Sequence, residues 1–121
     1  MSNKPTLVIG ASDNPDRYAY KAIKSLQQKG HTVYAEGIRN GQVDDIIIST
    51  ENNNYSNIDT ITLYVGPQNQ PAWYDYILSL HPKRIIFNPG TENPELMQLA
   101  QEKGIETTEA CTLVLLSIGI Y

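Results

Sequence analysis

The chain is poor in cysteine, histidine, tryptophan and phenylalanine, with one Cys, two His, one Trp and one Phe among its 121 residues. The single cysteine, Cys111, excludes an internal disulfide and any site that needs a Cys-x-x-Cys pair. No segment approaches the ~20 apolar residues of a membrane-spanning helix, and no early stretch resembles a signal peptide. We therefore expect a cytoplasmic protein with no membrane partner.

Basic residues are also few. Nine Lys and Arg against 13 Asp and Glu give a net charge of −4, with a pI near 5.0. This balance argues against a broad nucleic-acid surface but allows a small cationic pocket. A hydrophobic content of 40% is that of an ordinary globular protein, and the length predicts one domain, residues 1–121, with one site.

Short apolar runs alternate with segments of helical periodicity, which predicts an α/β fold. We expect a Rossmann-like, doubly wound sheet of about five mostly parallel strands with helices on both faces. The predicted strands are residues 6–9, 32–35, 43–48, 60–65, 84–87 and a short 105–108. One predicted helix follows the first strand and ends at Gly30. A second begins near Pro71, and a third begins at Asn93-Pro94 and ends at Gly104.

The C-terminal run 112–118 is apolar nearly throughout, so periodicity does not separate a buried helix from a strand. We interpret it as a short helix that Thr112 caps and Gly119 ends. Because both of its sides are apolar, it is also the segment through which a homodimer would form.

The loop after the first strand, residues 10–17, is the main candidate site. Gly10 permits a tight turn and Ala11 permits close approach, while Ser12 and Arg17 add donors beside a positive helix end that suits phosphate. The alternative is a plain strand-to-helix turn. The loop matches neither the Gly-x-Gly-x-x-Gly dinucleotide fingerprint nor the Walker A motif, which leaves ATP-driven phosphate transfer unsupported.

Further turns are expected at the same edge of the sheet, because ligands of open parallel sheets bind at the carboxyl ends of the strands. These are residues 36–39, 65–67 and 88–91. Glu36, at the end of the second strand, is in the position of the acid that accepts a hydrogen bond from the ribose hydroxyl of NAD. Its negative charge would disfavour a nearby phosphate unless Arg39 or a lysine compensates for that charge. A solvated acid at a strand end is the alternative.

Four motifs together resemble the small stand-alone CoA-binding domain family, which is related to the N-terminal domain of the succinyl-CoA synthetase alpha subunit. They are Val8-Ile9-Gly10-Ala11-Ser12 with Asn14-Pro15-Asp16-Arg17 and Tyr20-Lys21-Ala22, then Thr62-Leu63-Tyr64-Val65, then Ile86-Phe87-Asn88-Pro89-Gly90-Thr91-Glu92-Asn93, and finally Glu109-Ala110-Cys111-Thr112-Leu113-Val114. The match spans nearly the whole chain. At the end of the second strand the family often has Asn-Pro, where this chain has Glu36-Gly37.

The resemblance implies a domain that holds the nucleotide end of coenzyme A. The cofactor-binding candidates, taken from the resemblance and the strand ends together, are Gly10, Ala11, Ser12, Asn14, Arg17, Tyr18, Lys21, Glu36, Gly37, Arg39, Val65, Gly66, Pro67, Asn88, Pro89 and Gly90. We expect a CoA-binding or acyl-CoA-binding protein without catalysis of its own. An NAD-binding or redox-sensing domain and the CoA-binding part of a two-component acyl-CoA ligase are the alternatives.

No catalytic or metal-binding constellation is evident in the sequence. His31 and His81 lie at element boundaries, and no pair of carboxylates is arranged for acid–base work. Cys111 beside an apolar run is usually a small buried hydrophobe, and its functional alternative is a mixed disulfide with the CoA thiol.

Overall fold

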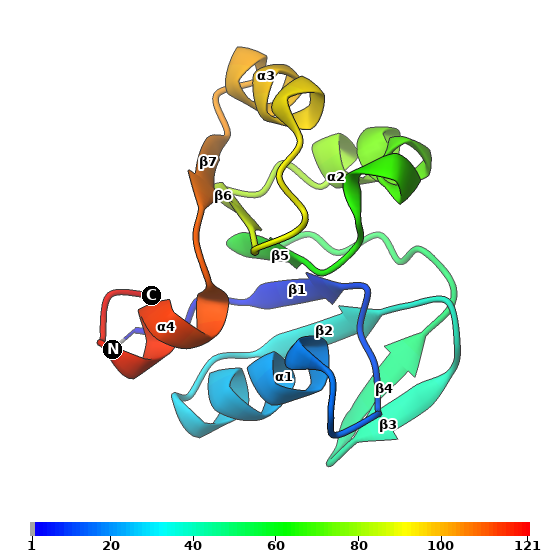
Figure 1. Cartoon of the computed structure of the whole chain (residues 1–121), viewed down its shortest axis with the longest axis vertical. Coiled ribbons are helices and arrows are strands. Elements are labelled where there is room, and N and C mark those ends of the chain that lie inside the picture. Colours follow the sequence, from blue (N-terminus) through cyan, green and yellow to red (C-terminus); the bar gives the residue numbers. More distant parts are fainter. Residues whose placement is uncertain (1) are drawn as a thin grey trace.

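The computed structural model describes residues 2–121 as a seven-stranded sheet flanked by helices (Figure 1). The strands are β1 (Thr6–Ile9), β2 (Val33–Glu36), β3 (Gly41–Val43), β4 (Ile46–Ser49), β5 (Thr60–Leu63), β6 (Arg84–Phe87) and β7 (Glu106–Glu109). The helices are α1 (Tyr18–Gln28), α2 (Tyr74–Ser79), α3 (Pro94–Glu102) and α4 (Thr112–Ser117), and two 3₁₀ turns, Pro67–Asn69 and Pro71–Trp73, precede α2. The predicted α/β class is confirmed.

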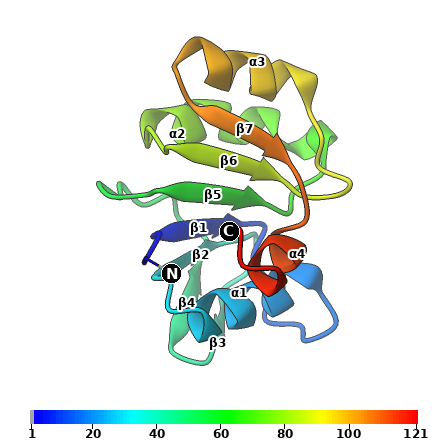
Figure 2. The same cartoon turned by 90° about the vertical axis from the view of Figure 1, so that its left-hand side faces the viewer.

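The sheet has the order β3-β4-β2-β1-β5-β6-β7, and every neighbouring pair except β3 and β4 is parallel. Without β3, this is the 3-2-1-4-5-6 order of the Rossmann fold. The arrowheads of β1, β5, β6 and β7 point to one edge of the sheet in Figure 2. The chain reverses its direction of winding between β1 and β5, so the fold predicts a ligand site beyond the ends of these two strands.

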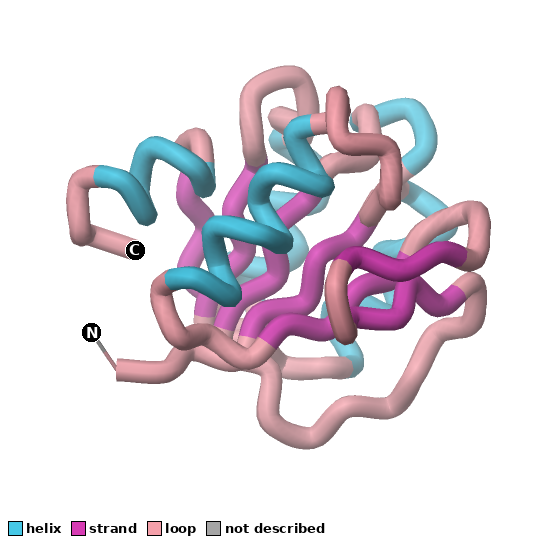
Figure 3. The backbone as a smooth tube through the Cα atoms, turned by 90° about the horizontal axis from the view of Figure 1, so that it is seen from below, coloured by secondary structure: helices cyan, strands magenta, loops and turns pink. Residues whose placement is uncertain are grey.

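Two hydrophobic clusters, one on each face of the sheet, hold these layers together. Alternate residues of a strand point to opposite faces, so Leu7 and Ile9 join the cluster that includes Ile77 of α2 and Leu96 of α3. Val8 joins the opposite cluster, with residues of α1 and α4. Figure 3 shows α1 lying across one face of the strands. The predicted doubly wound arrangement is confirmed.

The expectation of about five strands is wrong, because residues 43–48 do not form one strand. They form the β3–β4 hairpin, in which Gly41 to Val43 pair antiparallel with Ile46 to Ile48. Asp44 takes a positive φ of 54° at the turn, a conformation that Asp tolerates better than most residues. The predicted short strand at residues 105–108 corresponds to β7, which pairs in parallel with β6 and forms one edge of the sheet.

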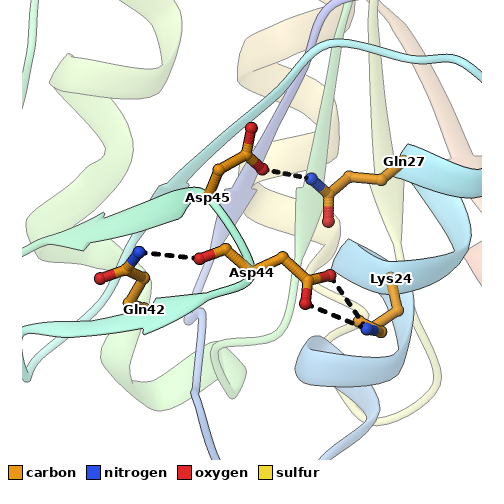
Figure 4. A network of polar contacts seen from close by, with 5 residues as sticks. All are labelled: Lys24, Gln27, Gln42, Asp44 and Asp45. Atoms are coloured by element: carbon orange, nitrogen blue, oxygen red, sulfur yellow. Dashed lines mark hydrogen bonds and ion pairs between the residues drawn. The ribbon is translucent and has the colours of Figure 1, made fainter.

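Side chains of the hairpin turn anchor it to α1 (Figure 4). Lys24 Nζ lies 2.9 Å from Asp44 Oδ2, and Gln27 Nε2 donates to Asp45 Oδ1 at 2.9 Å. Gln42 Nε2 closes the turn on the Asp44 carbonyl. The hairpin is thereby held against the helix that follows the first loop, which fixes one wall of the region described below.

The predicted helix ends are confirmed where glycine or asparagine determines them. Gly30, Gly104 and Gly119 have positive φ beyond α1, α3 and α4, and the Asn93 side chain accepts hydrogen bonds from the Glu95 and Leu96 amides at the start of α3. The Thr112 side chain does not cap α4 as expected. Its hydroxyl is buried against that of Thr62, 2.8 Å away.

The C-terminal run is the predicted helix, and it leaves Val114, Ile118 and Ile120 exposed. A homodimer through this segment stays a prediction. Light scattering at high concentration should give twice the monomer mass, and the variant Ile118→Asp should give the monomer mass. A monomer mass for the unmodified chain would contradict the homodimer.

Among residues 2–121, no helix combines the length and apolarity of a membrane span.

Buried His31 makes the free energy of unfolding dependent on pH. Its side chain is 4% exposed, and its Nδ1 accepts a hydrogen bond from the Lys4 amide. Burial, and then the charges of Lys4 and Arg84, lower the pKa of His31 below 6.5, while Asp59 acts in the opposite direction. The folded state thus favours neutral imidazole, so this stabilisation is present above pH 6.5 and is lost as the pH falls towards the lowered pKa.

We expect the free energy of unfolding from urea titrations to be lower at pH 5.5 than at pH 7.5 on account of this group. His81→Gln, a substitution of the other and exposed histidine, is the control variant, and the loss of stability at low pH that we assign to His31 should persist in it. A pH profile that stays the same in His31→Gln would contradict this assignment.

Candidate functional site

Two glycines let β1, β2 and β5 end close together at the switch point. Gly10 has φ +87°, and a Cβ there would lie 2.8 Å from the backbone C and O of Tyr64. A Cβ on Gly37 would lie 2.6 Å from the Ala11 carbonyl oxygen. Real Cβ atoms do not approach backbone so closely, so both positions require glycine for packing. The predicted tight turn at Gly10 is confirmed.

Backbone hydrogen bonds determine which amides of the first loop remain available. The Gly10 and Ala11 amides donate to the Glu36 carbonyl at 2.9 and 3.0 Å, so these two are engaged within the protein. Asn14 N donates to Ser12 Oγ. Within residues 2–121, the Ser12 and Asp13 amides donate to no protein acceptor. The same holds for the first amides of α1, where the positive end of the helix dipole lies. The open donors thus lie at residues 12–13 and at the helix start.

A cavity of about 800 Å³ opens at this point, between the first loop, the β2–β3 turn and the end of β5. Its volume is in the range of small-molecule sites. Ten of the predicted site residues line it: Gly10, Ala11, Ser12, Asn14, Arg17, Tyr18, Gly37, Arg39, Val65 and Gly66. The structure therefore brings together the parts of the chain that the sequence singled out separately.

The charged residues around the cavity are Arg17, Arg39 and Asp13. Both arginines are exposed, and among the described residues neither forms a salt bridge. The Asp13 carboxylate lies against Gly41 of the hairpin, since a Cβ on that glycine would be 2.6 Å from Asp13 Oδ2. With two guanidinium groups and one carboxylate, the charged side chains that line the cavity sum to one positive charge in a protein whose net charge is −4.

The Glu36 side chain points away from this cavity. It is 1% exposed, and its Oε2 accepts hydrogen bonds from the Tyr76 hydroxyl at 2.7 Å and the Asn53 amide at 3.0 Å. Burial, and then the hydrogen bond to Glu36, raise the pKa of Tyr76. The carboxylate therefore ties the end of β2 to α2 and to the loop at residues 50–57. It does not line this cavity.

A second, smaller cavity of about 240 Å³ adjoins the first. Tyr18 and Tyr64 line both, and the remaining wall consists of Asn88, Pro89, Cys111 and Leu113. Tyr64 is largely buried, and burial raises its pKa to about 12. The phenol therefore stays neutral at physiological pH. The ends of β5 and β6 and the start of α4 meet at this cavity.

The Asn88 side chain is occupied in holding these elements together. It is 2% exposed. Its Nδ2 donates to Thr62 Oγ1 and to the Leu63 carbonyl at 2.7 and 2.8 Å, and its Oδ1 accepts from the Thr112 amide at 2.9 Å. Asn88 thus acts as an anchor between β5, β6 and the first turn of α4. It positions Cys111 and Leu113 at the small cavity.

Four predicted site residues line neither cavity: Lys21, Glu36, Pro67 and Gly90. Lys21 lies near the site nonetheless, with Nζ 5.3 Å from the ring centre of Tyr18. Sequence reasoning missed several lining residues, which are Asp13, Ala19, Ile38, Asn40, Ile48, Tyr64, Asn69, Trp73 and Leu113. Asp13 and Ile38 lie inside the segments 10–17 and 36–39 that the sequence had singled out, so their position at a strand end was the signal that could have found them.

The order of the strands and the position of the cavity at the switch point are those of a Rossmann-like α/β domain. Residues 4–117 match the family described as CoA binding domain. The chain belongs to this family, as its sequence motifs predicted. None of the curated proteins matches it.

Solved structures resemble the whole chain. An uncharacterized protein is 47% identical, with 100% of each chain covered and a TM-score of 0.97. A hypothetical protein from Pyrococcus horikoshii is 23% identical over 93% of this chain and 80% of its own, with a TM-score of 0.83. A Thermus thermophilus protein is 19% identical over 98% and 91%, with a TM-score of 0.86. The last two likenesses show the shared fold alone.

Proposed function

We propose that this domain binds coenzyme A, with the phosphates of its nucleotide half in the large cavity. The observation that carries the proposal is the position of that cavity. It lies at the switch point, between the open amides of Ser12 and Asp13, the start of α1, and the unpaired side chains of Arg17 and Arg39. Membership of the CoA-binding family supports the same ligand.

The environment of Glu36 favours CoA over NAD. Its Oε2 accepts hydrogen bonds from Tyr76 and Asn53, and its Oε1 is shielded from solvent without a partner among the described residues. Because Glu36 does not line the large cavity, its carboxylate is out of reach of a ribose hydroxyl there. Arg39, which lines the cavity three residues further on, is the group we assign to the 3′-phosphate that distinguishes CoA from dephospho-CoA.

This assignment gives a testable prediction. The wild-type protein should bind CoA about tenfold more tightly than dephospho-CoA in isothermal titration calorimetry, as expected for one charge-assisted hydrogen bond at an accessible site. Arg39→Ala should weaken CoA to the affinity of dephospho-CoA and leave dephospho-CoA unchanged. Exposed Lys83→Ala is the control. Equal affinities of the wild-type protein for the two ligands would contradict the assignment.

We propose further that the domain binds without catalysing a reaction, as a carrier, a sensor or a partner subunit. Among residues 2–121, no group of three or more His, Cys, Asp and Glu is arranged to hold a metal ion. The side chains lining the two cavities include no histidine.

A role as the CoA-binding part of an acyl-CoA ligase is the second candidate function. Family membership supports this role and a binding role without catalysis equally. Formation of acyl-CoA in a mixture of this protein, a partner chain, ATP and a carboxylic acid would favour the second.

A further inference from the structure

The small cavity continues the ligand site and differs from it in chemistry. Arginines and open amides surround the large cavity, whereas Tyr18, Tyr64, Pro89 and Leu113 form most of the wall of the small one. Two of the polar side chains of this wall, those of Asn88 and Tyr64, are turned inward. The Asn88 amide is bonded to Thr62, Leu63 and Thr112, and the Tyr64 hydroxyl is shielded from solvent. This pocket therefore suits an apolar group attached to whatever the large cavity holds.

We propose that the small cavity is an acyl pocket, and that the ligand is a short-chain acyl thioester of CoA rather than free CoA. This inference rests on the proposed function, because it needs the nucleotide half in the large cavity. Tyr18 and Tyr64 border both cavities, so an arm that leaves the phosphate loop past these rings enters the small cavity. The thioester then lies beside Cys111, with the acyl chain against Leu113.

The volume sets the length of the acyl chain. At about 30 Å³ for each water-sized group, 240 Å³ holds about eight non-hydrogen atoms. The thiol end of the pantetheine arm takes about four of these, so about four remain for the acyl group. Acetyl to butyryl groups fit this space, and long-chain acyl groups exceed it. Free CoA would leave half of an apolar pocket unfilled, without the contacts that stabilise binding.

Calorimetry with a series of ligands tests the size of the pocket. Burying one methylene is worth about 0.8 kcal/mol, or about fourfold in affinity. Butyryl-CoA should therefore bind at least tenfold more tightly than CoA, and palmitoyl-CoA should bind less tightly than butyryl-CoA. Equal binding of CoA and butyryl-CoA, or tightest binding of palmitoyl-CoA, would overturn the proposal.

Cys111, the sole cysteine of the chain, reports on occupancy of the small cavity. Alkylation by iodoacetamide, followed by mass spectrometry, should slow at least tenfold in saturating butyryl-CoA. Saturating 3′,5′-ADP, which has the nucleotide half without the arm, should leave the rate unchanged. If 3′,5′-ADP binds but butyryl-CoA does not protect Cys111 from alkylation, the proposal of an acyl pocket fails and the proposed binding of CoA is retained. If no CoA-type ligand binds, the proposed function fails as well.

A substitution that fills the pocket separates the acyl pocket from the nucleotide site. Leu113→Trp should abolish the preference for butyryl-CoA over CoA and retain the affinity for 3′,5′-ADP within about twofold, which also shows that the variant is folded. Ser117→Trp, on an exposed position of the same helix, is the matched control and should keep the preference. An unchanged preference in Leu113→Trp would overturn the proposal.

Discussion

Replacing Arg17 by alanine is expected to weaken the binding of CoA by about 1.5–3 kcal/mol, which corresponds to about 10- to 150-fold in Kd. Arg17 precedes the first residue of α1 and lines the large cavity. No salt bridge among the described residues occupies it. Its guanidinium adds charged donors where the dipole of α1 and the open amides of the first loop already favour a phosphate. Isothermal titration calorimetry measures the change.

Two further variants make this result specific. Arg17→Lys should recover part of the affinity, because a lysine keeps the charge but loses the forked pair of donors. Lys29→Ala removes an exposed positive charge just beyond the other end of α1 and should change affinity by less than twofold. An unchanged Kd in Arg17→Ala would place the phosphates away from the first loop.

Substitution of Gly10 by alanine should have the largest effect on both folding and binding. The new Cβ would meet the backbone of Tyr64 at 2.8 Å in a residue with φ +87°. The left-handed conformation costs about 1–2 kcal/mol, and overpacking adds about 1–3 kcal/mol. Because the loop has to move away from β5 to relieve the clash, CoA affinity should fall by more than tenfold wherever the protein remains folded.

Gly30 supplies a matched control for the backbone strain. Its φ is +85°, and a Cβ there would meet no atom within 4 Å. Gly30→Ala should therefore lower the free energy of unfolding by about 1–2 kcal/mol and leave CoA affinity unchanged. Urea titration and calorimetry on the same samples give both quantities. Equal losses of stability in the two variants would contradict the role assigned to the approach of Gly10 to Tyr64.

The strands and helices of the central fold could be predicted because their sequence signals are local. Val8 and Ile9 lie in a short apolar run that ends at Gly10, and Asn93-Pro94 marks the start of α3, as the structure confirms. The β3–β4 hairpin could not be separated from a single strand, since its two-residue turn consists of Asp44 and Asp45 instead of a glycine pair. Antiparallel pairing at an edge depends on tertiary contacts such as those of Lys24.

The candidate site was predictable in position more than in the roles of its side chains. Strand ends locate the rim of the site, which explains why residues 10–14, 17 and 65–66 line the large cavity. Whether a polar side chain faces a ligand or the interior depends on the pleat of its strand and on distant partners. Glu36 turns towards Tyr76, and Asn88 turns towards Thr62 and Thr112. Neither partner is near in sequence, so the buried roles of both residues emerge only from the fold.

The most direct test of the account is a calorimetric comparison of CoA with NAD under identical conditions. Because Glu36 is engaged inside the protein while Arg17 and Arg39 remain open at the cavity, CoA should bind at least 100-fold more tightly than NAD. The difference corresponds to about 2.7 kcal/mol. An affinity for NAD that equals or exceeds the affinity for CoA would contradict the central claim.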